Sequence, residues 1–116
     1  MFVYRVEHKE TRHGPYCTDL QPPDGVGRLL VETHTNPATH PIEYELLDPS
    51  MAAWRYGFES LYLLERWFEG FLDLLHEEGF RVMQYEVPQR YVRHGTRQLR
   101  FDPDQAEFLG PVYVEQ

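Results

Sequence analysis

The chain has 116 residues and a formal net charge of −8, with 19 acidic against 11 basic residues. Its length suits a single domain over residues 1–116. A hydrophobic fraction of 41% excludes wholesale disorder, and the acidic balance disfavours a broad basic surface that binds nucleic acid directly.

Residues 1–8 are predicted as the first strand. Their alternation places Phe2 and Tyr4 on one side of an extended chain and Arg5 on the other. We expect the aromatic side to face the core. Arg5 then either meets a ligand phosphate in a cleft or pairs with a polar neighbour such as Glu7 across a solvated sheet face.

Irregular structure is expected in most of the next fifty residues. Residues 11–16 and 20–27 are predicted turns, because Gly-Pro, Pro-Pro and Asp-Gly pairs interrupt regular structure there. Residues 28–34 favour a short strand. Residues 35–49 form a proline-punctuated loop, and long loops in compact domains are often functional. Residues 49–58 favour one short helical turn.

Residues 60–79 carry the clearest pattern, which predicts one long amphipathic helix. Ser60 is a good N-cap, because its hydroxyl can accept from free backbone N–H groups. Gly79 is a natural left-handed terminator. Gly70 lies in the middle of this helix, where glycine costs about 1 kcal/mol relative to alanine.

The C-terminal third favours short strands. Residues 80–88 and 96–101 are predicted strands, residues 89–95 one helical turn, and residues 111–114 a possible last strand. Helix and strands alternate without regular βαβ units. The fold class predicted is therefore α+β, with a small mixed sheet packed on one long amphipathic helix.

Titratable side chains give no strong metal or nucleophile motif. His34 and His40 share a loop and could hold a metal together with a glutamate, which leaves a metal-dependent hydrolase as a weaker alternative. Cys17 is the only cysteine, so no intrachain disulfide can form. The chain also lacks a secretion signal and a stretch of about 18 apolar residues, so we expect a cytoplasmic protein without a membrane span. We assign no metal site.

Three aromatic residues, Trp54, Tyr56 and Phe58, precede the predicted helix. Aromatic and glycine residues beside a helix start can form a stacking wall with backbone donors for an anion. The alternative is that they pack the turn onto the core.

Three short motifs in this order resemble those of ADP-ribosyltransferase-like proteins. They are Tyr4-Arg5 at the end of the first strand, GFES at residues 57–60 before a helix, and the strands within residues 85–101. The pattern also resembles small proteins encoded by phages and actinobacteria. The first resemblance implies an ADP-ribosyltransferase-like fold that handles NAD or ADP-ribose as cofactor or substrate.

The resemblance also assigns site residues. Arg5, Tyr4, Tyr56, Phe58 and Ser60 would bind the nucleotide, and the catalytic positions would be Gln98 and Glu59. Gln98 stands where the family has its catalytic glutamate. An amide offers only a dipole to a developing oxocarbenium charge, so either another acid, such as Glu59 or Glu86, acts or the fold is retained for binding.

A second function fits the same sequence. Small size, acidity and the missing glutamate are compatible with a non-catalytic inhibitor that binds a protein, encoded by a phage and directed at a host or defence protein. The expected partner is therefore either a nucleotide or a protein target.

Overall fold

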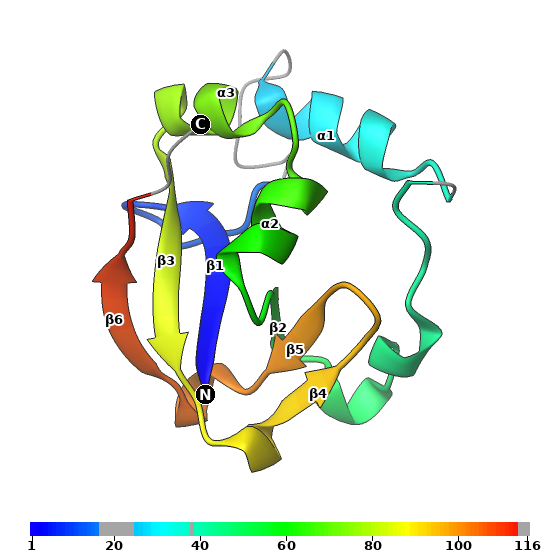
Figure 1. The fold of residues 1–116 in the computed structure, drawn as a ribbon, viewed down its shortest axis with the longest axis vertical. Coiled ribbons are helices and arrows are strands. Elements are labelled where there is room, and N and C mark those ends of the chain that lie inside the picture. Colours follow the sequence, from blue (N-terminus) through cyan, green and yellow to red (C-terminus); the bar gives the residue numbers. More distant parts are fainter. Residues whose placement is uncertain (17–24, 38, 114–116) are drawn as a thin grey trace.

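Two small antiparallel sheets form the framework of the protein (Figure 1). The computed structural model describes residues 1–16, 25–37 and 39–113. The first sheet has the order β1-β3-β6, with strands at Phe2–His8, Phe80–Glu86 and Glu107–Pro111. The second has the order β2-β5-β4, with strands at Arg55–Gly57, Leu99–Phe101 and Val92–His94. The predicted α+β class is confirmed, but one mixed sheet is wrong, because all paired strands are antiparallel.

A single β-bridge joins the two sheets at Tyr4 and Phe58. The Tyr4 N–H donates to the Phe58 carbonyl at 2.8 Å, and the Phe58 N–H donates to the Tyr4 carbonyl at 2.7 Å. Gly57 makes this approach possible, because a Cβ there would lie 2.7 Å from a methyl group of Val3. The bridge holds Arg5 of β1 next to Tyr56 of β2.

The first helix, α1, occupies Val26–His34, so the predicted strand over residues 28–34 is wrong. Its buried residues include Val26 and Leu30, which are one helical turn apart. The Val26 N–H donates to a carboxylate oxygen of Glu78 at 2.8 Å. This contact across the fold satisfies a free N–H group of the helix start.

The long helix predicted over residues 60–79 is divided into α2, at Leu61–Trp67, and α3, at Leu72–Glu77. Gly70 lies between them with φ +87°, a left-handed conformation that ends a helix. A Cβ on Gly70 would touch nothing within 4 Å, so its role is conformational. The Ser60 cap is confirmed by a bond from the Leu63 N–H at 3.2 Å.

Short 3-10 helices account for most of the other differences. They lie at Tyr44–Leu46, Pro49–Met51, Gln89–Tyr91 and Pro103–Gln105. The helical turn predicted over residues 49–58 is confirmed only at Pro49–Met51, because β2 occupies Arg55–Gly57. The turn predicted over residues 89–95 is likewise confirmed only at Gln89–Tyr91, because β4 occupies Val92–His94. The last strand ends at Pro111 rather than beginning there. Cys17 and the first five residues of the predicted 20–27 turn lie outside the described residues.

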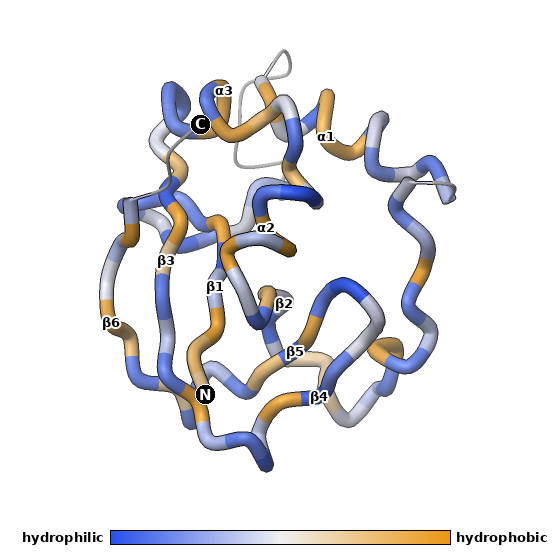
Figure 2. Tube along the Cα trace, in the orientation of Figure 1, coloured by the Kyte–Doolittle hydropathy of each residue, from blue (hydrophilic) through white to orange (hydrophobic). Residues whose placement is uncertain are grey.

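Two apolar clusters make up the core, and Figure 2 shows the apolar positions along the elements that form it. One lies between the helices and the first sheet and includes Val6, Leu64 and Phe80. The other lies between the sheets and includes Val3 and Phe101. Both faces of β1 are therefore covered by apolar side chains, including the face that carries Val3 and Arg5.

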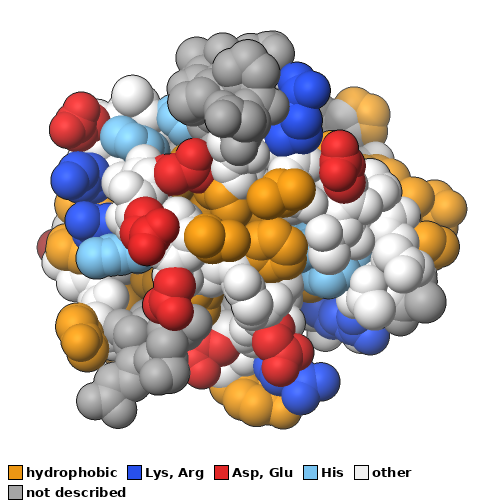
Figure 3. Space-filling view, turned by 90° about the horizontal axis from the view of Figure 1, so that it is seen from above, with side chains coloured by type: hydrophobic (Ala, Val, Ile, Leu, Met, Phe, Trp, Pro, Cys, Tyr) orange, Lys and Arg blue, Asp and Glu red, His pale blue; other side chains and the backbone are white. Residues whose placement is uncertain are grey.

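The face that carries α1 and α3 shows apolar side chains surrounded by acidic ones (Figure 3). Leu29 of α1 and Leu74 of α3 are 49% and 43% exposed, and Asp73 and Glu77 of α3 are exposed beside them. Among the described residues, no helix has the length and apolar character needed to cross a membrane.

Candidate functional site

A pocket of about 460 Å³ lies beside β1, between the end of α1, residues 40–47 and the end of α2. Four of the residues that the resemblance assigned to a nucleotide site line it together: Arg5, Tyr56, Phe58 and Gln98. They come from β1, β2, the bridge that follows β2, and the turn before β5. A larger groove of about 870 Å³ between α3 and β3 is lined by none of the predicted site residues.

Arg5 is held with most of its side chain buried, 14% of it remaining exposed. Its Nε donates to Glu7 at 3.0 Å and its Nη1 donates to the Tyr56 carbonyl at 2.9 Å. Its Nη2 makes no hydrogen bond to the described residues and lies beside Gly14, where a Cβ would come within 3.1 Å. Burial lowers the pKa of Arg5, and the carboxylate of Glu7 opposes this shift. Because Nη2 is not bonded to the described residues, Arg5 presents a guanidinium with a spare donor at the pocket wall.

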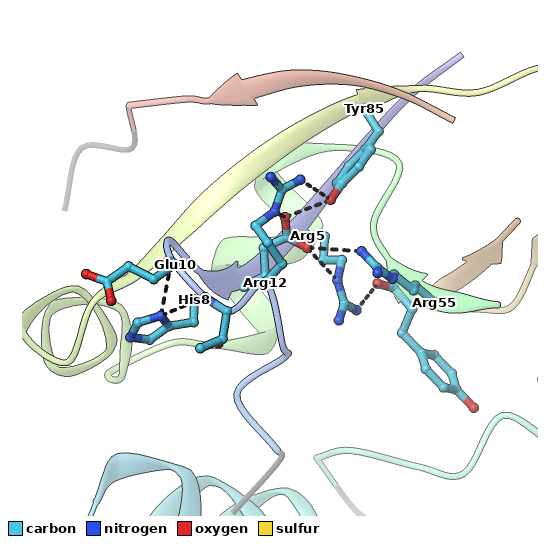
Figure 4. A network of polar contacts seen from close by, with 9 residues as sticks. Arg5, His8, Glu10, Arg12, Arg55 and Tyr85 are labelled. Carbon is cyan, nitrogen blue, oxygen red and sulfur yellow. Dashed lines mark hydrogen bonds and ion pairs between the residues drawn. The ribbon is translucent and has the colours of Figure 1, made fainter. Parts of the chain in front are cut away.

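Glu7 is fully buried and anchors a cluster of cations (Figure 4). One of its oxygens accepts from Arg12 Nε at 2.6 Å and from the Tyr85 hydroxyl at 2.7 Å, and the other accepts from Arg5. Arg55 lies 3.8 Å away. A buried carboxylate with such partners fixes the positions of the guanidinium groups around it. Arg5 therefore pairs with Glu7 as expected, but on a buried rather than a solvated face. It also lines the pocket, and its contact with a ligand phosphate stays a prediction.

Gln98 and Glu43 line the pocket together with Arg5. Glu43 is 8% exposed and accepts from the backbone N–H groups of Arg97 and Gln98 and from the Gln98 side-chain amide at 3.2 Å. Gly95 allows this approach, because a Cβ there would lie 2.8 Å from a Glu43 oxygen. Glu43 could not be selected from the sequence, because nothing in its spacing distinguishes it from Glu45. It does lie in the 35–49 segment that was expected to be functional.

Tyr56 forms an aromatic wall of the pocket, with the guanidinium of Arg100 lying 4.7 Å from its ring centre. Arg100 is buried and donates to the carbonyl groups of Leu46 and Trp54 at 3.0 and 2.9 Å. A cation against one face of the ring restrains Tyr56. Of the three aromatic residues before α2, Tyr56 and Phe58 reach the pocket.

The opposite wall is an aromatic and histidine cluster. The indole N–H of Trp67 donates to the Tyr16 hydroxyl at 2.7 Å, and His34 stacks on His40 with ring centres 3.8 Å apart. Burial and the neighbouring His40 lower the pKa of His34 to about 4, so it is neutral at pH 7, and its Nδ1 shares a hydrogen bond with the Tyr16 hydroxyl. Burial also raises the pKa of Tyr16. The side chains of His34 and Tyr16 in this wall are therefore neutral near pH 7.

His34 and His40 are not joined by a third metal-ligating side chain among the described residues. In the part of the chain that the structure describes, no three His, Cys, Asp or Glu side chains are arranged to hold a metal ion. His40 instead donates from Nε2 to the Trp67 carbonyl at 3.0 Å.

The remaining predicted site residues lie away from the pocket lining. The Tyr4 hydroxyl accepts from the Gln84 amide at 3.3 Å, and its backbone forms the bridge to Phe58. Glu59 is exposed and lies 3.9 Å from His94. Ser60 uses its hydroxyl to cap α2. The structure therefore brings Arg5 and Gln98 to one pocket but leaves Ser60 and Glu59 outside it.

Comparison with known proteins gives one match. A model of the family described as Bacteriophage T4 Y00F protein matches residues 1–115. No curated protein and no solved structure matches the chain. The match covers all the elements from β1 to β6, and it is to a phage family rather than to the ADP-ribosyltransferase-like superfamily.

Proposed function

The chain belongs to the bacteriophage T4 Y00F protein family, and on this basis we propose that it is a phage protein that binds a nucleotide-type small molecule. NAD and ADP-ribose are the first candidates. The observation that carries the proposal is the meeting of Arg5, Tyr56 and Gln98, distant in sequence, around one pocket.

The polar groups of the pocket suit a ligand with two kinds of polar group. Arg5 offers the spare N–H donors of Nη2, which match a phosphate oxygen. Glu43 and Gln98 add a carboxylate and an amide to the pocket lining, which match ribose hydroxyl or carboxamide groups. A nucleotide carries both kinds of group.

The size and walls of the pocket support the same class of ligand. Its volume of about 460 Å³ lies within the range of about 300–1,000 Å³ found for small-molecule sites. Tyr56 and Trp67 supply flat aromatic surfaces to the pocket lining, and such surfaces suit a planar base or nicotinamide ring.

The proposal is for binding rather than turnover. Gln98 lacks the negative charge that an oxocarbenium-like transition state requires. Glu43 is the carboxylate beside it, and both of its oxygens already accept from N–H donors. Glu59, the other acid considered, lies outside the pocket lining.

A thermal-shift measurement with ADP-ribose, NAD and AMP at millimolar concentration tests the proposal. A ligand that binds only the folded state raises the melting temperature. We expect ADP-ribose to raise it for the wild type and for Tyr62→Leu, a control on the exposed side of α2. The shift should be lost in Tyr56→Leu and reduced in Gln98→Ala. An equal shift in Tyr56→Leu and wild type, or none in the wild type with any of the three, would refute the proposal.

A second candidate function is non-catalytic binding to a protein, such as a host or defence protein. Exposed apolar side chains at the pocket rim favour it: Ile42 is 61% and Leu47 56% exposed, and Tyr44 between them is 75% exposed. Exposed apolar patches of this kind occur at protein interfaces. A complex recovered from cell lysate should be lost in an Ile42→Ser/Tyr44→Ser variant and kept in Tyr62→Ser. Elution of the protein alone would contradict this candidate.

A further inference from the structure

We propose that Arg12 and Arg55 form a binding site for a phosphate group on the outer side of the Glu7 cluster. Arg12, in the turn after β1, and Arg55, of β2, approach Glu7 from different elements, and Figure 4 shows their side chains together with that of Arg5. The inference does not depend on the proposed nucleotide pocket, because neither Arg12 nor Arg55 lines that pocket.

The three arginines of the cluster carry more positive charge than the single carboxylate of Glu7 neutralises. Three guanidinium groups lie within 4 Å of this carboxylate, at 3.0, 2.6 and 3.8 Å. Arg5, Arg12 and Tyr85 already supply three hydrogen bonds to its two oxygens. At 3.8 Å, Arg55 is too distant to add another. A local surplus of positive charge therefore exists in a chain whose net charge is −8.

The two outer arginines keep donors available. Arg12 uses Nε for Glu7 and Nη2 for the Tyr85 hydroxyl, which leaves Nη1 unbonded among the described residues. Arg55 makes no hydrogen bond through its guanidinium to those residues. The side chains are 35% and 39% exposed, so a solute can reach both.

Arg12 is held in place before any anion arrives. Its guanidinium lies 3.6 Å from the ring centre of Phe108, which restrains the group by cation–π contact. Its backbone has φ +65°, a left-handed conformation that is uncommon for residues other than glycine. Such backbone strain persists where surrounding contacts fix the residue and is enriched at ligand-binding sites.

Phosphate is the anion that these donors fit best. Guanidinium groups bind phosphate oxygens through paired N–H donors, and a phosphate has enough oxygens to contact two such groups that approach from different sides. The nearest nitrogens of Arg12 and Arg55 lie 2.6 and 3.8 Å from the two oxygens of one carboxyl group, so both guanidinium groups are within reach of one bridging phosphate. The phosphate can belong either to a free phosphate compound or to the ligand of the neighbouring pocket, since Arg5 is common to the cluster and the pocket lining.

Titration with inorganic pyrophosphate, followed by calorimetry, tests the site. Arg55→Gln removes one of the two cations and only a 3.8 Å ion pair, so folding should be retained. Arg66→Gln changes the net charge equally at an exposed position of α2. We expect pyrophosphate to bind the wild type and Arg66→Gln alike, and to bind Arg55→Gln more weakly by about tenfold or more.

A second titration with ADP-ribose separates the two sources of phosphate. If Arg55→Gln weakens ADP-ribose as well, the phosphate belongs to the pocket ligand; if it weakens pyrophosphate alone, the site takes a separate anion. Equal pyrophosphate affinity of Arg55→Gln and Arg66→Gln, or no binding to the wild type at millimolar concentration, would overturn the inference. Failure of the pocket proposal looks different, because ADP-ribose would then not bind the wild type while pyrophosphate did.

Discussion

Replacement of Glu7 by glutamine should destabilise the protein severely. The substitution keeps the size of the side chain, so no cavity forms, but it removes the only carboxylate within 4 Å of Arg5 among the described residues. Loss of one partner from a buried ion pair costs about 3–5 kcal/mol, because a buried charge is left without compensation. Small domains are stable by about 5–15 kcal/mol, so Glu7→Gln removes a large share of the total.

Two further variants test whether the loss of stability in Glu7→Gln arises from the burial of an unpaired charge. Tyr85→Phe deletes two hydrogen bonds to charged groups, one donated to Glu7 and one accepted from Arg12, and should cost at least about 1.5–3 kcal/mol. Arg55→Gln removes a half-exposed ion pair and should cost less than about 1 kcal/mol. Urea unfolding followed by tryptophan fluorescence gives the three values if the m-value is unchanged. A loss below about 1 kcal/mol for Glu7→Gln, or an equal loss for Arg55→Gln, would refute this reasoning.

Three other outcomes follow from single residues. Ser60→Ala removes the cap on α2 and should lower the free energy of unfolding by about 1 kcal/mol in urea titrations; Ser60→Gly should lower it by less. Gly70→Ala should cost about 1–2 kcal/mol, because φ is +87° there although space is free, and no loss would contradict the conformational role. His34 has a pKa near 4 in the folded state and about 6.5 when unfolded, so the unfolded chain binds more protons between these values. Stability should therefore fall as pH drops through this window, and the fall should be smaller in His34→Gln when unfolding is compared between pH 4 and 7.

Local features of the fold could be predicted because their physical cause is local. The strand at Phe2–His8, the Ser60 cap and the left-handed Gly79 depend on nearest neighbours in sequence, and the structure confirms them. The expectation that the aromatic side of this strand faces the core is wrong for Phe2, which is 47% exposed, whereas Val3 and Glu7 of the other side are buried. Gly70 is the visible cause of the division between α2 and α3. A glycine within a helix costs only about 1 kcal/mol, however, so the sequence could not show whether Gly70 ends the helix or is tolerated inside it.

Features that depend on distant contacts could not be predicted. The start of α1 is completed by Glu78, which is 52 residues away, while the local run of Leu and Val also suits a strand. The burial of Glu7 requires that the second sheet cover β1, which alternation alone does not reveal. The pocket shows the same limit, because Arg5 and Gln98 were selected as separate motifs, and Glu43 gains its role only when the fold places it beside Gln98.

The location of a bound nucleotide tests the central claim most directly. Backbone amide spectra of the 15N-labelled protein, recorded during titration with ADP-ribose, map the contact surface residue by residue. The account predicts concentration-dependent shifts centred on Gly14, Tyr56 and Gln98, which line the pocket from three separate segments. Shifts confined to the α3–β3 groove, or a spectrum unchanged at millimolar ADP-ribose, would contradict it.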